Sequence, residues 1–465
     1  MATYDEEELY GRRFAEDEIK YLACELPDDI KAFKFAGDFA GEKKLIAKWL
    51  AKAGLPFYMR RRLEIEDIIA TEMAKDYLID FDGILESLRK KYPAVQPENL
   101  EYIIGLGNAD YIYKNGQRYF QRSCVSNILS CNDRYLESLD GGAMPGYVPN
   151  SLRHENLDIM RSKGYRAVRI RINERIRVAD HAVKEGKLVR VHLPYPSITP
   201  EQSDIVLHST SHPVYISSAP QRTLYMEQFC RPGEVYSAEF SYTLKIPYFT
   251  PEPAAAKEDH PDFYLGEQLP QIRFTPLIRE LAADLKGRET NPLILARRAY
   301  DWVTKNVVYS YMRHYFCMEN IPEFAMINGK GDCGVMALLF ITLCRAMGVP
   351  ARWQSGSHVR PTGISSHDWA QFYVEPYGWL YCDPSFGGGA GRSGDTELWN
   401  HYFSNLDTFR EINATEFASP FDPPRNFIRT DPYDNQSGEI EYADEWLGFD
   451  DAKRGRNVVS YEDVD

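Results

Sequence analysis

The stretch Gly329–Phe386 decides the fold and reads GKGDCGVMALLFITLCRAMGVPARWQSGSHVRPTGISSHDWAQFYVEPYGWLYCDPSF. Its first half predicts a helix over residues 334–347, because apolar residues recur at helical spacing until Gly348 and Pro350 end the pattern. Cys333 is therefore expected at or near the helix N-terminus. Free backbone N–H groups and the helix dipole stabilise an anion there, so the position predicts a lowered thiol pKa and a nucleophilic thiolate.

The second half of the stretch predicts two strands joined by a turn. Residues 367–374 alternate along the chain with aromatic and β-branched side chains, a turn occupies residues 375–378, and residues 379–383 return. This reversal brings His367 and Asp383 near each other, with a bulge or side-chain reach making up an offset between them. A carboxylate beside an imidazole fixes the imidazole tautomer and stabilises the imidazolium that forms when a thiol loses its proton.

Each of these three residues also has an ordinary structural interpretation. Cys333 alone is equally well a small buried cysteine in a core helix, His367 a hydrogen-bonded core histidine, and Asp383 a turn residue before Pro384. Their combination, in this order and on fitting elements, favours a thiol-acylation site in which the cysteine attacks a carbonyl carbon.

Three motifs resemble those of the transglutaminase-like superfamily of papain-type cysteine enzymes, and specifically its bacterial members. The motifs are Gly331-Asp-Cys-Gly334, His367-Asp-Trp369 and Tyr381-Cys-Asp-Pro384, and the resemblance covers roughly residues 275 to 386. It implies that Cys333 is the nucleophile, His367 the general base and acid, and Asp383 the orienting carboxylate.

The superfamily holds protein-crosslinking acyltransferases, cysteine proteases and peptide N-glycanases, so the resemblance leaves the reaction open. Animal crosslinking enzymes carry Gln before the cysteine and Trp after it, where this chain has Asp332 and Gly334. This difference favours a cysteine-dependent amide hydrolase, a peptidase or amidase acting through an acyl-thioester. The alternatives are protein-glutamine acyl transfer, peptide N-glycanase-like deglycosylation, and a non-catalytic binding protein on this fold.

Four aromatic residues are further candidates for oxyanion stabilisation or substrate binding: Tyr309, Trp353, His358 and Trp369. Tyr309 is a candidate donor to the oxyanion, although packing beneath the helix explains it equally well. Trp353 and His358 lie between the predicted helix and the predicted strand, where relatives present substrate-facing loops. Trp369 is more readily explained by packing beside the histidine. Residues 386–394 are rich in glycine and predict a loop at the edge of the site.

Elsewhere the sequence predicts an α+β protein in four parts. Residues 1–146 are mostly helical, with a hairpin at Asn115-Gly116 and a linker at 141–146. Residues 160–250 alternate in short runs and predict an antiparallel β-sandwich-like module. Residues 271–395 form the papain- or transglutaminase-like catalytic core. Residues 396–465 are too aromatic for a disordered tail and are expected to wrap over that core, with a frayed end.

Composition restricts the partners and the compartment. The net charge of −14 argues against binding to nucleic acid or to an anionic membrane. A peptide, protein or glycopeptide substrate is expected because each of these suits a thiol nucleophile. Eight cysteines without paired spacing favour a reducing compartment, and no signal sequence is recognisable, so we expect a cytoplasmic protein. No metal-ligand spacing is recognisable, and we expect neither a metal nor a cofactor. The oligomeric state is not determined by the sequence.

Overall fold

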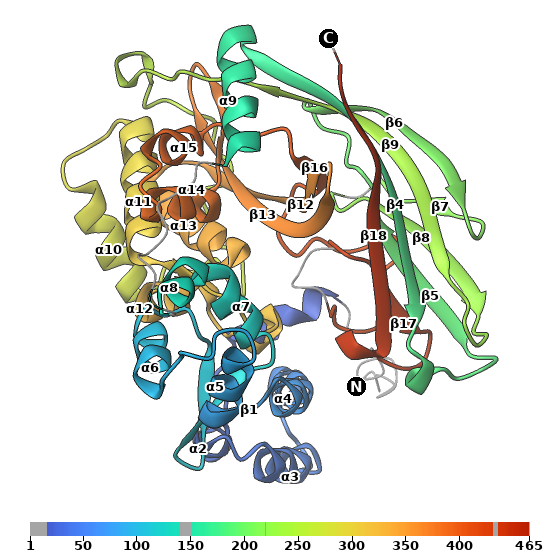
Figure 1. Cartoon of the computed structure of the whole chain (residues 1–465). Coiled ribbons are helices and arrows are strands. Elements are labelled where there is room, and N and C mark those ends of the chain that lie inside the picture. The colour runs from blue at the N-terminus through green and yellow to red at the C-terminus, as the bar shows by residue number, and fades with distance from the viewer. Residues whose placement is uncertain (1–15, 140, 142–149, 219, 431–435, 465) are drawn as a thin grey trace, which may run out of the picture.

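The stretch that contains Cys333 folds into a buried helix packed on a five-stranded antiparallel sheet (Figure 1). The structure, a computed structural model, describes residues 16–139, 141, 150–218, 220–430 and 436–464. The helix is α13 (Cys333–Met347). The sheet has the order β15 (Phe403–Ser404), β14 (Gly378–Cys382), β13 (Gly363–Val374), β12 (Ala351–Arg360) and β16 (Arg410–Ala414).

Helix α13 begins and ends as the sequence predicts. The Asp332 side chain caps its first turn by accepting a hydrogen bond from the Val335 N–H at 3.1 Å, and Gly348 ends it with φ 92°, a left-handed conformation that glycine adopts without strain. Almost every residue of α13 is buried, because β12 and β13 cover one side and neighbouring helices cover the other. The remaining elements of this core are α10 (Pro276–Lys286), α11 (Pro292–Asn306), β10 (Val308–Tyr309), α12 (Ile321–Asn328), β11 (Lys330–Gly331), α14 (Pro384–Arg392) and α15 (Thr396–His401).

Two four-stranded sheets form the β-sandwich on the right of Figure 1. One has the order β18-β4-β9-β6 and the other β17-β5-β8-β7. Their apolar faces share one hydrophobic core, as expected from the alternation in this region. Their strands are β4 (Tyr165–Val178), β5 (Leu188–Pro194), β6 (Gln202–Thr210), β7 (Tyr215–Ile216), β8 (Thr223–Phe229), β9 (Tyr236–Pro247), β17 (Glu439–Tyr442) and β18 (Ala452–Asp463).

The expected frayed end of the C-terminal segment is wrong, because its last part is a strand that pairs in the sandwich and also contacts the core sheet. Strand β17 joins β5, and β18 pairs with β4 in antiparallel register from Ala452↔Val178 to Asp463↔Val168. Without β18, the long strand β4 would be an open sheet edge with unpaired backbone groups. The chain end therefore completes the sandwich, and this pairing between the two ends of the module has no local sequence signal.

The N-terminal region is mostly helical, with one small sheet. The predicted hairpin is confirmed: β2 and β3 pair across Asn115 and Gly116, both of which have positive φ. The region comprises α2 (Asp28–Ala36), α3 (Phe39–Leu50), α4 (Phe57–Asp76), β1 (Tyr77–Asp80), α5 (Phe81–Arg89), α6 (Pro97–Gly105), β2 (Tyr111–Lys114), β3 (Gln117–Gln121), α7 (Cys124–Cys131) and α8 (Asp133–Ser138), and α9 (Ser151–Lys163) leads into the sandwich. The predicted linker falls mostly outside the described residues.

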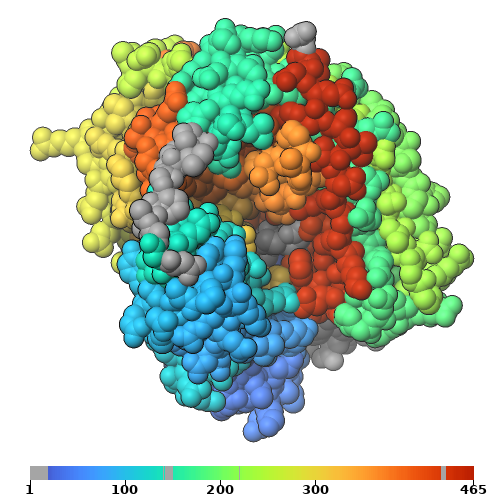
Figure 2. Space-filling model, in the orientation of Figure 1, coloured from blue at the N-terminus to red at the C-terminus, as the bar shows by residue number. Residues whose placement is uncertain are grey.

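A buried ion pair ties the N-terminal region to the core. Asp110 accepts hydrogen bonds from Arg313 at 3.0 Å and lies 3.1 Å from the Lys330 ammonium, three residues before Cys333. On the face shown in Figure 2, the blue N-terminal region and the red C-terminal segment flank a hollow. Among the described residues, no helix has the length and apolar character needed to cross a membrane.

Candidate active site

The thiol of Cys333 lies at the first residue of α13 and is almost completely buried, with 8% of the residue exposed. Its sulfur donates a hydrogen bond to Oδ2 of Asp368 on β13 at 3.3 Å. Tyr315 lies beside the same turn, where its hydroxyl donates to the Asp332 carboxylate. The thiol is therefore enclosed by two carboxylates and a phenol.

This environment raises the pKa of the Cys333 thiol well above its usual value, which is the opposite of the shift that the sequence predicts. Burial is the largest cause, followed by the negative charges of Asp368 and Asp332. A helix N-terminus stabilises an anion by about 2 kcal/mol at most, whereas full burial shifts a pKa by several units, each worth about 1.4 kcal/mol. Desolvation and like charge therefore outweigh the helix dipole, and the group is a thiol at neutral pH.

The imidazole of His367 lies on the opposite face of β13 from Asp368. Its Nε2 lies 2.7 Å from Oδ2 of Asp383, so these two predicted residues are brought together. The register pairs Ala370 with Cys382, which places Asp383 diagonally across from His367, and side-chain reach closes the offset. The ring of Phe386 stacks on the imidazole at 4.1 Å between centroids.

Cys333 and His367, both among the described residues, are not joined by a hydrogen bond: the thiol contacts Asp368 and the imidazole contacts Asp383. Alternation along β13 explains this: Asp368, Ala370 and Phe372 face α13, whereas His367 and Trp369 face the second hydrophobic cluster. The sequence held a signal for this outcome, because the face that carries Asp368 is also the more apolar face of the strand.

A buried guanidinium completes the surroundings of the His367–Asp383 pair. Arg410 on β16 lies 2.9 Å from Oδ2 of Asp383, and its Nε donates to Asp407 at 3.0 Å. Burial acts to raise the pKa of Asp383, but His367 and Arg410 outweigh it and hold this pKa well below its usual value. Burial lowers the pKa of His367, and the charge of Arg410 lowers it further, whereas the charge of Asp383 raises it. The imidazole is therefore neutral at pH 7 and able to accept a proton.

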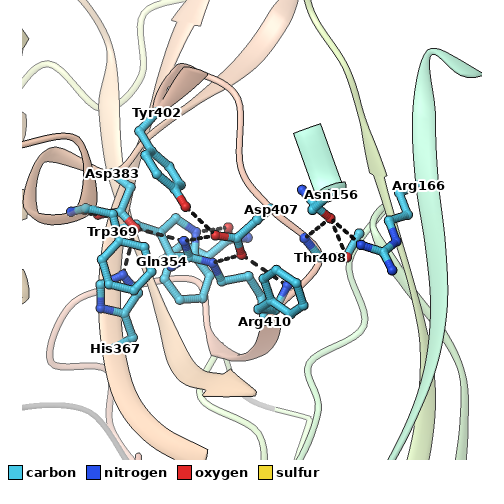
Figure 3. A network of polar contacts seen from close by, with 12 residues as sticks. Asn156, Arg166, Gln354, His367, Trp369, Asp383, Tyr402, Asp407, Thr408 and Arg410 are labelled. Carbon is cyan, nitrogen blue, oxygen red and sulfur yellow. Dashed lines mark hydrogen bonds and ion pairs between the residues drawn. The ribbon is translucent and has the colours of Figure 1, made fainter. Parts of the chain in front are cut away.

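Figure 3 shows that this polar network continues away from His367 toward the β-sandwich. The Tyr402 hydroxyl donates to Asp407 at 2.7 Å, and Asn156 Oδ1 accepts hydrogen bonds from Thr408 at 2.8 Å and from Arg166 at 3.2 Å. The network thus links β13 of the core to α9 and β4 of the sandwich. Sequence analysis missed Asp368, Arg410 and Asp407 as parts of the site, and only Asp368 had a local signal.

The four predicted aromatic residues divide between the two faces of the sheet. Tyr309 lies beside Cys333, and burial together with that thiol raises the pKa of the phenol. Trp353 is on the same face as Asp368 but packs in the core against Phe417, with ring centroids 5.2 Å apart. Both remain candidates for contact with a substrate on the thiol side.

His358 and Trp369 lie on the other face of the sheet, with His367 and away from the thiol, so a role for them in substrate binding stays a prediction. The indole N–H of Trp369 donates to Gln354 at 2.6 Å, and the residue is completely buried. Burial lowers the pKa of His358 to about 2, which keeps its imidazole neutral. The predicted loop over 386–394 is mostly helix α14, which places Phe386 on the imidazole.

Comparison with known proteins agrees with the arrangement of the core. Residues 279–384 match the family model of the transglutaminase-like superfamily. This segment is similar to the core of that superfamily. The match covers α10 to the end of β14, with Cys333, His367 and Asp383 inside it. It includes neither the N-terminal helical region nor the sandwich, so it says nothing of their roles.

Similarity to individual proteins is limited. A protein of Haemophilus influenzae without an assigned activity is 27% identical over 138 residues, which are 24% of this chain and 37% of that protein. The chain thus spans little more than a third of this relative's length.

Two solved structures are also similar. One is a proposed cysteine protease from Cytophaga hutchinsonii (15% identity, 65% of this chain and 91% of that one, TM-score 0.41). The other is the periplasmic domain of TgpA from Pseudomonas aeruginosa (14% identity, 50% and 92%, TM-score 0.28).

The core offers no metal site among the residues that the structure describes. No group of three or more His, Cys, Asp or Glu side chains in this part of the chain could hold a metal ion. The chemically competent groups of the core are a buried thiol, the Asp368 carboxylate in contact with it, and the neutral imidazole of the neighbouring residue His367, which is held by a second carboxylate, Asp383, at the start of α14.

Proposed function

We propose that the protein is a cysteine-dependent amide hydrolase in which Cys333 is the nucleophile. The observation that carries the proposal is the position of this thiol: it occupies the first residue of α13 and contacts β13 at the residue next to His367, whose imidazole is held by Asp383 at 2.7 Å. The Cys333 sulfur would attack the amide carbonyl carbon, the amine would leave with a proton, and water would release the acyl group from the thioester.

His367 is the base in this proposal, and Asp368 keeps the thiol protonated and therefore inactive. The neutral imidazole has the basicity to take the thiol proton, and Asp383 stabilises the imidazolium that results. The Asp368 carboxylate instead holds the proton on sulfur. Activation therefore requires the backbone at 367–368 to turn, so that Asp368 leaves the sulfur and the imidazole reaches it.

The first experiment asks whether turnover depends on Cys333. A library of peptides and glycopeptides is incubated with the full chain, and acyl adducts and products are followed by mass spectrometry. Cys333→Ala should abolish turnover and adduct formation, whereas Cys344→Ala, in the last turn of the same helix, should retain both. Turnover that survives in Cys333→Ala would reject the proposal.

The same assay separates hydrolysis from acyl transfer. With a primary amine added in excess, a hydrolase gives mainly free acid, whereas a protein-glutamine acyltransferase gives mainly the amine conjugate. Release of glycan from the glycopeptides would instead identify a peptide N-glycanase-like activity. The residues beside the nucleophile, Asp332 and Gly334, favour hydrolysis by the resemblance given above.

A non-catalytic binding protein is the second candidate, and one observation favours it. The Cys333 thiol is buried, its pKa is raised, and it contacts Asp368 rather than His367. This candidate predicts that iodoacetamide at pH 7 does not label Cys333 with or without peptides, whereas an enzyme is labelled when a substrate opens the site. The cytoplasmic location and the peptide, protein or glycopeptide partners remain predictions.

A further inference from the structure

Strand β18 of the sandwich contacts the core sheet beside the proposed active site. Figure 1 shows β18, in red, running next to the end of the core sheet that β12 and β13 form. Arg456 on β18 donates hydrogen bonds to the hydroxyl groups of Ser357 on β12 and Ser366 on β13, both at 3.2 Å. Ser366 directly precedes His367 in the chain. The C-terminal strand therefore holds β13 next to the residue that carries the proposed base.

Gln436 extends this contact to the thiol. Its side-chain amide donates one hydrogen bond to the His367 carbonyl at 3.2 Å and another to Oδ1 of Asp368. The other carboxylate oxygen of Asp368 accepts the hydrogen bond from the Cys333 sulfur. The backbone carbonyl of Gln436 accepts a hydrogen bond from Arg456 at 2.6 Å. The contacts thus run without a gap from β18 through Gln436 and Asp368 to the proposed nucleophile.

Burial makes these contacts difficult to replace. Gln436 and Asp368 are each only 3% exposed, so water has little access to take over as donor to the carboxylate. A hydrogen bond to a charged group is stronger than one between neutral groups, and a buried acceptor that loses its donor is costly. Turning residues 367–368 breaks both hydrogen bonds from Gln436 at once.

The residue after the nucleophile leaves room for this arrangement. A Cβ atom at Gly334 would lie 2.7 Å from Oδ2 of Asp368 and 2.2 Å from the Tyr315 hydroxyl, well inside van der Waals contact. Any larger residue there would displace one of these groups. Glycine at this position therefore lets the carboxylate reach the sulfur, where Gln436 holds it.

We propose that Gln436 and Arg456 are positioning residues that hold Asp368 on the Cys333 thiol and so keep the active site in its resting state. The two residues are called the C-terminal latch below. This inference rests on the proposed hydrolase, in which residues 367–368 turn before the imidazole reaches the sulfur. Release of the latch from β13 permits that turn, so the sandwich acts on the core through two side chains.

The rate of iodoacetamide labelling at Cys333, in the full chain without substrate, measures the latch directly. Gln436→Met keeps the length of the side chain and removes the amide, so this rate should rise about tenfold, as expected for the loss of a hydrogen bond to a charged group. Asp368 keeps its charge in the variant, so the gain should be the same at pH 6 and at pH 9. The buried Cys344 and Cys382 should stay slow. An unchanged rate at Cys333, or equal gains at all three cysteines, would overturn the proposal.

Variants of the second latch residue and of its acceptor test the link to β18. Arg456→Met should also raise the labelling rate at Cys333, and the milder Ser366→Ala, which removes one acceptor, should raise it about threefold. Lys453→Met is the matched control: it removes a positive charge from the same strand, but the Lys453 ammonium pairs with Asp180 of the sandwich at 3.1 Å. The control should leave the rate unchanged. Equal gains in Lys453→Met and Arg456→Met would refute the latch, because loosening of β18 as a whole would then be the cause.

A double-variant cycle separates positioning from a general structural role. In an Asp368→Ala background the thiol has already lost the carboxylate, so adding Gln436→Met should change the labelling rate by less than about twofold. The same tenfold gain in both backgrounds would show that Gln436 does not act through Asp368, and would overturn the proposal.

Turnover distinguishes failure of the latch from failure of the proposed function. Gln436→Met should raise kcat/KM on the peptide library, and a kcat/KM that falls while labelling rises would overturn the resting-state role. Turnover that survives in Cys333→Ala would reject the hydrolase, whereas the labelling rates would still report whether Gln436 holds Asp368 on the thiol.

Discussion

Replacing Asp368 with Asn should make the Cys333 thiol more reactive. The Asp368 carboxylate accepts the thiol hydrogen bond at 3.3 Å and raises the pKa of the thiol both by that bond and by its charge. Asparagine keeps the shape of the side chain, removes the negative charge and can turn an N–H toward the sulfur. Each of these changes favours the thiolate over the thiol.

The distance sets the size of the effect. Two unit charges 3.3 Å apart repel by about 5 kcal/mol at an effective dielectric constant of about 20. If relaxation of the site removes half of that repulsion, about 2.5 kcal/mol remains, which corresponds to nearly two pKa units. The thiolate fraction at pH 7 should therefore rise by a factor on the order of 10 to 100.

Site-resolved alkylation measures this change directly. The rate of iodoacetamide labelling at Cys333 is followed by mass spectrometry from pH 6 to 10 in the wild type and in Asp368→Asn. The buried Cys344 and Cys382 serve as internal references, because burial raises the pKa of both. The midpoint of the Cys333 profile should move to lower pH in the variant, while the references stay slow.

Turnover of the same variant decides which residue is the base. If His367 takes the proton, Asp368→Asn retains or gains amide hydrolysis and a His367→Asn variant loses it. An Asp368→Asn variant with unchanged or slower labelling of Cys333 would refute the electrostatic reasoning. A variant that labels faster but has lost all turnover would show that Asp368 is the base.

Two further predictions concern the buried charges. Arg410 lies 2.9 Å from Asp383 and 3.0 Å from Asp407, so Arg410→Met leaves both carboxylates without their shared cation. The variant should lose about 3–5 kcal/mol of unfolding free energy in urea, whereas Arg169→Met, at an exposed position, should lose little. Equal losses in the two variants would contradict this reasoning. Burial raises the pKa of Glu411 to about 7, so the folded state holds its proton more tightly than the unfolded state, and ionising Glu411 costs stability increasingly as pH rises from about 4 through 7. Glu411→Gln should therefore gain stability over the wild type at pH 8 but not at pH 5, and a gain of the same size at both pH values would refute the assignment.

Much of the core could be predicted from the sequence because its signals are local. Helical spacing ended by Gly348 predicts α13, and period-two alternation ended by a turn predicts β13 and β14. The same pattern predicts that His367 and Asp383 approach each other, since adjacent antiparallel strands share one turn. Each of these inferences depends only on a pattern within a short, continuous stretch of the chain.

By itself, the sequence determined which elements carry Cys333, His367 and Asp383, and that the histidine and its carboxylate meet. The more apolar face of β13 favoured the side that carries Asp368, but only the tertiary structure established that this face packs on α13 and hence that Asp368 rather than His367 contacts the thiol. It also decided that burial outweighs the helix dipole, and that Arg410 reaches Asp383 from β16. The physical reason is that strand alternation fixes relative sides, whereas the choice of side and the degree of desolvation come from packing between segments distant in the chain.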